Sequence, residues 1–168
     1  MSKTEEILAN GNELIKDFVL SSRNPEPNRL DVWIEASNLK AAVSNIIENH
    51  WGYLITITGM DQPPKYDEAG NQISEGKIEG LYPFANQDAI LTLRTTVDYA
   101  NPKFDSICEI IPSATIYERE FIELFGVEII STPDTSHLVL PDVWPENTYP
   151  LRKSFTGLKD DQIVWKGE

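Results

Sequence analysis

The sequence of 168 residues predicts a single α+β domain, with a mixed sheet of about four strands, helices packed on it and an extended C-terminal tail. Three observations lead to this prediction. Residues 30–34 and 53–58 alternate apolar and polar side chains as strands do, and the residues between them have helical spacing. Residues 78–84 and 89–97 alternate again and are close enough in sequence to form a hairpin. After Gly126 large apolar residues continue with neither period, interrupted by prolines.

The composition indicates a folded globular protein, because 40% of the residues are hydrophobic and 24% are charged. These fractions exclude a disordered tail, a collagen-like fibre and a coiled coil. The formal net charge is −13, from 14 basic and 27 acidic residues. Nucleic acid and anionic lipid are therefore not expected partners, since both bind basic surfaces.

The sequence also predicts a cytoplasmic protein with no direct membrane insertion. No apolar stretch approaches the roughly 18–20 residues that a membrane-spanning helix needs. The N-terminal residues include acids where a secretory signal peptide carries bases, and no apolar segment follows them.

Local signals predict the order of elements in the first half of the chain. A capping box and the apolar spacing after it predict a helix over roughly residues 3–20. A second helix follows Ser37 and connects two strands, which should therefore be parallel with a right-handed crossover. Residues 61–76 are typical of a polar loop. Pro83 indicates that its strand ends there or lies at an edge of the sheet.

Residues 104–126 have helical spacing and contain a proline, so they predict two consecutive helices separated at Pro112. The second begins near Ser113 and ends at Gly126 in a left-handed cap. The chain then divides into three parts: an N-terminal helix and linker (1–28), an α+β core (29–126) and an extended docking tail (127–168).

The second of these helices carries an acidic side chain in an unusual place. On a helical wheel Glu118 falls inside the apolar arc, while Arg119 and Glu123 lie opposite, four residues apart, where they can pair. A carboxylate in an apolar arc is costly to bury unless it is hydrogen-bonded. Two interpretations stay open: Glu118 forms a capping box with Thr115, or it pins the helix to a neighbouring basic or backbone group.

The chain offers few residues for redox or metal chemistry. Its single cysteine, Cys108, lies on an apolar face and is interpreted as a core residue, and its two histidines are His50 and His137. This set is too small to hold an iron–sulfur cluster or a structural zinc ion. His50 fits a helix end, whereas for His137 a partner contact and a solvated loop are equally open.

The tail predicts a binding surface for another protein. Large apolar residues without period gain little from their own core and are better ordered against a partner. Arg152 and Lys153 are the only basic pair in the C-terminal third, so we expect them to contact a partner and fix its register.

The string Tyr-Glu-Arg-Glu-Phe-Ile-Glu-Leu-Phe-Gly-Val at 117–127, with the later Thr-Pro-Asp, Leu-Pro-Asp, Trp-Pro and Tyr-Pro-Leu-Arg-Lys-Ser-Phe motifs, resembles a known family. It is similar to the hydrophilic 30-kDa subunit family of respiratory complex I (NADH:quinone oxidoreductase), including the related subunit of energy-converting membrane-bound nickel–iron hydrogenases. The resemblance is specific over 113–155 and looser over 29–112. The residues that carry it are Glu118, Arg119, Glu120, Glu123, Phe125, Gly126, Pro133, Asp134, Pro141, Asp142, Trp144, Tyr149, Pro150, Leu151, Arg152, Lys153 and Phe155.

The sequence departs from the family pattern in three places. Thr132 stands where the family usually has His, residues 135–137 stand where a basic pair is usual, and Ser154 stands where Asp is usual. The Leu-Pro-Asp-x-Trp-Pro stretch at 140–145 looks more like the hydrogenase-related and archaeal branches.

The resemblance implies a non-catalytic subunit of the peripheral arm, with no catalytic, cofactor-binding or metal-binding residue of its own. It implies docking on the large subunit near the quinone site, or near the nickel–iron site in a hydrogenase. The whole complex would carry iron–sulfur clusters, use NADH and quinone or nickel–iron, and hold this chain at the cytoplasmic face of the membrane. Two alternatives remain: a stand-alone acid–base enzyme using Glu118, Glu120 or Glu123, and a free-standing adaptor that binds peptides through the tail.

Overall fold

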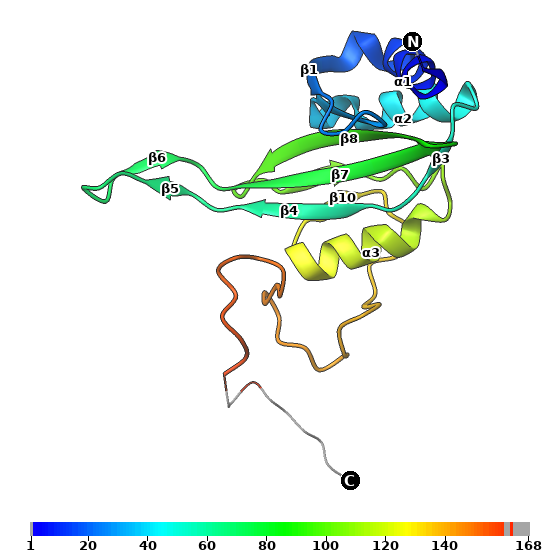
Figure 1. The fold of residues 1–168 in the computed structure, drawn as a ribbon. Coiled ribbons are helices and arrows are strands. Elements are labelled where there is room, and N and C mark those ends of the chain that lie inside the picture. The colour runs from blue at the N-terminus through cyan, green and yellow to red at the C-terminus, as the bar shows by residue number, and fades with distance from the viewer. Residues whose placement is uncertain (1, 160–161, 163–168) are drawn as a thin grey trace.

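The computed structural model describes residues 2–159 and 162 (Figure 1). Its helices are α1 (Lys3–Ile15), the 3₁₀ turns η1 (Lys16–Phe18) and η2 (Ala36–Asn38), α2 (Leu39–Glu48) and α3 (Ala114–Phe125). Its strands are β1 (Val19–Arg23), β2 (Arg29–Ile34), β3 (Tyr53–Leu54), β4 (Thr58–Gln62), β5 (Lys65–Tyr66), β6 (Gln72–Ser74), β7 (Lys77–Asn86), β8 (Ala89–Asp98), β9 (Lys103–Asp105) and β10 (Glu128–Ile130).

A six-stranded mixed sheet forms the centre of the domain. Its order is β1-β2-β8-β7-β3, and β4 also pairs with β7. The β2–β8 pair is parallel and the other pairs are antiparallel. The predicted α+β class and mixed sheet are confirmed, but about four strands was an underestimate.

The helices cover one face of this sheet. The strand register places Leu30, Leu91 and Phe84 on that face, together with Gly59. Leu30 adjoins α1 across a hollow, and Gly59 lies against the aromatic rings of α3. In Figure 1, α1 and α2 accordingly lie over the β1–β2–β8 half of the sheet and α3 lies over the β4 half.

The opposite face carries a buried ionic cluster. Arg94 on β8 bonds Glu79 on β7 at 2.9 Å and Asp31 on β2 at 2.8 Å. Its guanidinium also lies 4.7 Å from the ring centroid of Trp33, whose indole nitrogen donates to Glu79 at 3.0 Å. Because every charged group is paired, the cluster can stay buried and link three adjacent strands.

The predicted helix over residues 3–20 is too long. The first helix ends at Ile15 rather than near residue 20, and Val19–Arg23 pairs with β2 as an edge strand. The exposed side chains of β1 carry no alternation that could have marked it as a strand. The α2 helix joins strands that run parallel, as expected, but β8 and β7 lie between them.

The predicted loop at 61–76 is also wrong, because these residues complete β4 and then form the β5–β6 hairpin. This hairpin extends beyond the sheet as an arm (Figure 1). Its residues are almost all exposed, so no apolar face marked them as strands.

Pro83 lies inside the long strand β7, between β8 and the edge strands, and not at an edge. The β3 and β4 pairings with β7 stop at Leu54 and resume at Thr58. Pro83 faces this gap and its carbonyl accepts from the Ile55 N–H at 2.8 Å. A residue without an N–H is tolerated where the neighbouring strand is interrupted.

The region before α3 contains no helix of the predicted kind. Phe104 belongs to β9, which pairs in parallel with β10, and residues 106–113 form turns. Phe104 packs against Phe121 with ring centroids 5.1 Å apart. This tertiary contact outweighs the helical spacing of the sequence.

Candidate functional site

Helix α3 is the platform of the candidate site. It buries Ala114, Phe121 and Phe125 against the sheet, and the Phe121 and Phe125 rings meet edge-on at 5.5 Å. It ends as predicted at Gly126, whose φ of 66° is left-handed and whose N–H bonds the Ile122 carbonyl at 2.8 Å. A Cβ added at Gly126 would overlap the Tyr149 ring, so glycine also permits the tail to pass closely.

Glu118 is the buried carboxylate of α3, with 1% of its surface exposed. It accepts hydrogen bonds from the Ser106 hydroxyl at 2.9 Å, the Ile107 N–H at 2.8 Å and the Cys108 thiol at 3.2 Å. These bonds pin the turn after β9 to the helix. The pinning interpretation is therefore confirmed. The capping box with Thr115 is wrong, because Thr115 lies inside the helix and the N-cap residue, Ser113, makes no side-chain cap bond.

Cys108 is half-buried beside this carboxylate. Burial, and then the neighbouring Glu118, raise the pKa of its thiol above the ordinary value. A thiol kept protonated in this way is a weak nucleophile, which argues against covalent chemistry at Cys108.

Arg119 and Glu123 do not pair with each other, which corrects the prediction from their spacing. Glu123, 6% exposed, accepts backbone N–H bonds from three consecutive residues, Leu138, Val139 and Leu140, at 3.1, 2.7 and 3.2 Å. Arg119 donates to the carbonyls of Ser136 and His137 at 2.9 and 2.6 Å and lies 3.5 Å from Asp134. Together these contacts form the first anchor of the tail.

The second anchor joins the tail to β4 and the end of α3. Asp61, 3% exposed, accepts from the Lys153 N–H at 2.8 Å and from the Tyr99 hydroxyl. Arg152 donates to the Phe125 carbonyl and lies 4.5 Å from the centroid of the Tyr99 ring. A cation beside the last carbonyls of a helix is favourable.

This anchor changes the interpretation of the basic pair. The Arg152 side chain is only 14% exposed and is used within the chain, whereas Lys153 remains exposed. Sequence reasoning missed Asp61 and Tyr99, and it placed Asp61 in a solvated loop. No local pattern could have found them, because Asp61 lies 92 residues from its partner Lys153.

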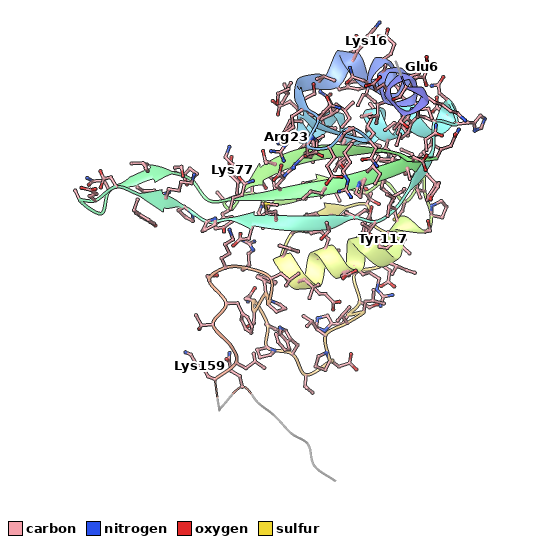
Figure 2. All side chains as sticks on the ribbon, in the orientation of Figure 1. Glu6, Lys16, Arg23, Lys77, Tyr117 and Lys159 are labelled. Atoms are coloured by element: carbon pink, nitrogen blue, oxygen red, sulfur yellow. The ribbon has the colours of Figure 1, made fainter. Side chains whose placement is uncertain are left out.

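The backbone of the tail is held by hydrogen bonds, but several of its apolar side chains remain exposed. The exposed fractions of Leu138, Val139, Val143 and Leu151 are 40, 60, 52 and 49%. Three aromatic residues of the tail are half-buried, namely Trp144, Tyr149 and Phe155. Figure 2 shows side chains projecting from the tail into the surroundings. The anchors thus hold an apolar surface outward.

The remaining residues that carry the family resemblance shape this surface. Asp134 accepts from Ser136 at 2.7 and 2.8 Å, and these bonds lower the pKa of its carboxyl. The Pro141 carbonyl accepts from the Trp144 N–H at 2.9 Å. A hollow of about 430 Å³ is lined by residues of both α3 and the tail. Its lining includes Ile122, Glu123, Thr135, His137, Leu140, Asp142, Trp144, Pro145, Glu146, Asn147, Thr148 and Tyr149.

Other residues that carry the resemblance lie on the apolar surface of the tail or at its edge. Glu120 and Leu151 line a second, smaller hollow together with Phe121. Pro133 is exposed and Pro150 is half-buried. The departures at 135–137 fall where Ser136 and His137 contribute backbone carbonyls to Arg119, which any residue could supply. The last part of the predicted tail, 160–161 and 163–168, lies outside the described residues.

Metal-ligating side chains and long apolar helices are both relevant to what the described part of the chain can do. Across residues 2–159 and 162, no three His, Cys, Asp or Glu side chains form a group that could hold a metal ion. In the same part of the chain, every helix is too short or too polar to cross a membrane.

A family comparison decides which proteins this arrangement belongs with. The model of the respiratory-chain NADH dehydrogenase 30 Kd subunit matches residues 32–161. The chain belongs to this 30-kDa subunit family. The resemblance carried by the Glu-Arg-Glu helix and the tail motifs is therefore confirmed, and it extends over the core as well.

Similar proteins include subunits of a formate hydrogenlyase, of a dehydrogenase and of an NADH-quinone oxidoreductase. The chain is 29% identical over 153 residues to formate hydrogenlyase subunit 5 of Escherichia coli, covering 87% of this chain but 25% of that protein. It is 27% identical over 134 residues to a subunit of the F420H2 dehydrogenase of Methanosarcina mazei, covering 78% of each. Against an NADH-quinone oxidoreductase subunit of Chloroherpeton thalassium the identity is 24%, covering 80% of this chain and 63% of that protein.

Solved structures share the fold of this member of the 30-kDa subunit family. A chain of the membrane-bound sulfane sulfur reductase, an archaeal respiratory membrane complex, superposes with a TM-score of 0.69 at 21% identity, covering 92% of this chain and 86% of that one. A trypsin-resistant fragment of Nqo5 gives a TM-score of 0.59 at 18% identity, covering 79% and 99%.

Proposed function

We propose that this chain is a non-catalytic subunit of the peripheral arm of a complex I-like NADH:quinone oxidoreductase, and that its tail docks on the large subunit near the quinone site. The observation that carries the proposal is the contrast within the tail. Its backbone is held by two anchors, while Leu138, Val139, Val143 and Leu151 keep 40–60% of their surface exposed.

Energetics favour such a surface for binding. Complete burial of a large aliphatic side chain contributes roughly 1.5–3 kcal/mol, so partly exposed residues have a fraction of this left to gain. Association also loses free energy when flexible segments become ordered. A tail already fixed by Glu123 and Asp61 loses less.

The lengths of the relatives support a large partner. The chain spans about a quarter of formate hydrogenlyase subunit 5 and of an NADH-quinone oxidoreductase protein of Rhodopseudomonas palustris. Those proteins thus hold the equivalent of this domain in one polypeptide with a much longer remainder. We infer that the separate chain makes the corresponding contact between subunits.

In this proposal the chain binds no cofactor itself. The complex supplies the iron–sulfur clusters and the NADH and quinone chemistry, and it holds the chain peripherally at the cytoplasmic face of the membrane. This assignment accords with the small number of cysteine and histidine residues in the chain.

A second candidate is the equivalent subunit of an energy-converting membrane-bound nickel–iron hydrogenase. Two observations favour it: the Leu-Pro-Asp-x-Trp-Pro stretch at 140–145, and the similarity to formate hydrogenlyase subunit 5 and to hydrogenase-4 component G, the latter 26% identical.

Affinity purification from the native host tests the proposal. The full chain carries a tag, membranes are solubilised in detergent, and mass spectrometry identifies the co-purifying subunits. NADH dehydrogenase-type subunits support the first candidate, and a nickel–iron large subunit supports the second. Recovery of the chain alone or with unrelated proteins contradicts both and favours the free-standing adaptor.

A pair of variants tests the tail itself. Val139→Asp places a charge on the exposed surface and should abolish co-purification. Ile116→Asp is the matched control, because Ile116 is 51% exposed on α3 outside the tail. Equal recovery of partners by both variants would show that the tail does not dock.

A further inference from the structure

The hollow lined by α3 and the tail, here called the tail hollow, is negatively charged. Its volume of about 430 Å³ lies within the range of about 300–1,000 Å³ that small-ligand pockets have. Three acids line it, Glu123, Asp142 and Glu146, and none of the described residues around it is a lysine or arginine. Glu123 already accepts three backbone N–H groups, so Asp142 and Glu146 carry the charge that is available to a ligand.

Asp142 and Glu146 enter no ion pair within the described chain, where the ion pairs of the tail join Arg119 to Asp134 and Arg152 to Asp61. Both acids are exposed. The Thr148 hydroxyl bonds the backbone carbonyl of Glu146, at 3.3 Å, and leaves its carboxylate unused. Two like charges on one hollow repel each other, so a cation from outside the chain is favoured there.

The neutral polar groups of the tail hollow add acceptors. The Trp144 indole N–H is already donated to the Thr148 carbonyl at 2.7 Å. The Nδ1 atom of His137 lies 3.3 Å from the Pro141 carbonyl. Since a carbonyl only accepts, Nδ1 carries the proton, and Nε2 of the neutral ring is an acceptor. A ligand group that only donates fits this lining, whereas a carboxylate or phosphate would meet negative charge.

Elsewhere in the same structure, an aromatic ring and carboxylates together hold a guanidinium. Arg94 lies 4.7 Å from the ring centroid of Trp33 and bonds two carboxylates. Arg152 lies 4.5 Å from the ring centroid of Tyr99 and 4.0 Å from Asp61. A guanidinium suits such sites because it is planar, stacks on aromatic rings and offers five N–H donors.

The tail hollow has the same combination of groups without a guanidinium from the described chain. Trp144 lines it together with Asp142 and Glu146, and the Trp144 ring packs on Phe155 with centroids 6.2 Å apart. We propose that the tail hollow binds an arginine side chain of the large subunit, which pairs with the two acids and lies on the Trp144 ring. The identity of this partner rests on the proposed function.

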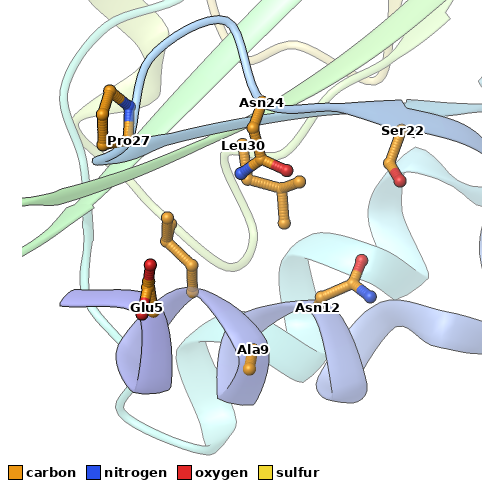
Figure 3. A pocket seen from close by; sticks show the side chains of 8 residues that line it. Glu5, Ala9, Asn12, Ser22, Asn24, Pro27 and Leu30 are labelled. Carbon is orange, nitrogen blue, oxygen red and sulfur yellow. The ribbon is translucent and has the colours of Figure 1, made fainter. Parts of the chain in front are cut away.

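The hollow at the N-terminal end of the domain is an internal control. Its volume is similar, about 420 Å³, and it lies between α1 and the β1–β2 segment (Figure 3). The described residues around it include no aromatic ring and a single acid, Glu5, whose carboxylate already accepts the Ser2 N–H at 2.7 Å. If the aromatic ring and the unused acids determine binding, this hollow should not take up arginine.

The first test is a nuclear magnetic resonance titration of the full ¹⁵N-labelled chain with three peptides. The probe is acetyl-Gly-Leu-Arg-Leu-Gly-amide. One comparison peptide carries citrulline in place of arginine, which keeps the shape and removes the charge, and the other carries lysine, which keeps the charge and removes the planar fork. The arginine peptide should shift the Trp144 indole N–H saturably, and the other two should bind about tenfold more weakly. The indole signals of Trp33 and Trp51 and the side-chain amide of Asn12, which lines the N-terminal hollow, should not move.

Protein variants assign the contacts. Asp142→Asn combined with Glu146→Gln removes both charges and nearly keeps the shape, and it should weaken the arginine peptide about tenfold. Glu68→Gln, at an exposed acid in the turn of the β5–β6 hairpin, is the control and should leave binding unchanged. An unchanged midpoint of thermal unfolding checks that the double variant is folded, and the comparison of peptides does not depend on it because it uses the unaltered chain.

The second test places the double variant in the affinity purification above. It should recover less than about a tenth of the large subunit that the Glu68→Gln control recovers. Equal recovery by the two variants would overturn the arginine contact and leave the docking of the tail intact. If even the unaltered chain recovers no large subunit, the proposed function fails together with the partner named here.

The titration decides the site itself, independently of the purification. Equal affinity for the arginine and citrulline peptides would show that charge plays no part, and equal affinity for the arginine and lysine peptides would show that any cation suffices. Either result overturns the arginine site, as does the absence of a saturable Trp144 shift at millimolar peptide.

Discussion

Arg119 and Glu123 lie one turn apart on α3, yet each binds the tail rather than the other. The Glu123 carboxylate accepts the Val139 N–H at 2.7 Å, and the Arg119 guanidinium donates to the His137 carbonyl at 2.6 Å. The basic residue takes carbonyls and the acidic residue takes N–H groups, so together they fix the direction of the tail along the helix. Arg119 of the Glu-Arg-Glu string and Glu123 after it thus hold the tail of their own chain.

The first prediction concerns Glu118. Replacing it with Ala leaves the buried Ser106 hydroxyl and the Ile107 N–H without their acceptor. Urea denaturation should show a loss of about 1–3 kcal/mol in the free energy of unfolding. Glu120→Ala, on the same helix and half-buried, is the control and should change it by less. A Glu118→Ala variant as stable as this control would mean that the hydrogen bonds contribute nothing.

The second prediction separates the tail from the core. Glu123→Gln leaves one acceptor oxygen for three N–H groups and removes the charge. Hydrogen exchange at residues 138–140 should accelerate, while exchange in β7 and β8 stays slow. The Leu151 N–H, which bonds the Leu124 carbonyl at 3.1 Å in the second anchor, should keep its protection. Uniform acceleration throughout the chain would contradict two separate anchors.

The third prediction concerns Gly126, where strain and crowding act together. In the Gly126→Ala variant, the new alanine must adopt a φ of 66° and also displace Tyr149. The free energy of unfolding should therefore fall by more than about 1 kcal/mol. Gly70 isolates the first effect, because its φ is 85° and no atom lies within 4 Å of an added Cβ. In thermal melts, the midpoint of unfolding should therefore decrease more for Gly126→Ala than for Gly70→Ala.

The fourth prediction is a loss of stability in alkali. Burial raises the pKa of Tyr82 far above its ordinary value of 10.0, and burial followed by Asp61 raises the pKa of Tyr99. Above about pH 10 the unfolded chain releases these protons before the folded chain does. The unfolded state then binds fewer protons, so stability is complete below pH 10 and falls as pH rises.

Variants assign this alkaline effect. Tyr82→Phe should reduce the alkaline loss of unfolding free energy most, since Tyr82 is 2% exposed. Tyr99→Phe should reduce this loss less. Tyr53→Phe, at a residue 66% exposed, serves as the control. Denaturant melts between pH 8 and 11 give the comparison, and an identical slope in the three variants would assign the decrease to other groups.

The fifth prediction concerns redox chemistry. One cysteine and two histidines are too few to ligate a cluster, so the purified chain should lack visible absorbance and stoichiometric iron, nickel or flavin. Iron–sulfur absorbance that persists after desalting would contradict a non-catalytic role.

The sequence predicted best where the structure depends on neighbours along the chain. The hairpin of β7 and β8 follows from alternation, and the end of α3 follows from Gly126. Glu118 was recognisable as unusual because a carboxylate stood within an apolar arc. The residues that bind Glu118 were not recognisable, since spacing along a helix does not indicate which other segments of the chain pack against it.

By itself, therefore, the sequence determined the α+β class, the α3 platform and membership of the 30-kDa subunit family, all of which are encoded in local periodicity and short motifs. Only the tertiary structure decided that Arg119 and Glu123 bind the tail, that Asp61 meets Lys153 across 92 residues, and that Phe104 lies in a strand. The reason is physical. Buried polar groups must be satisfied by whichever donors folding brings near, and hydrophobic burial against distant elements outweighs local propensity.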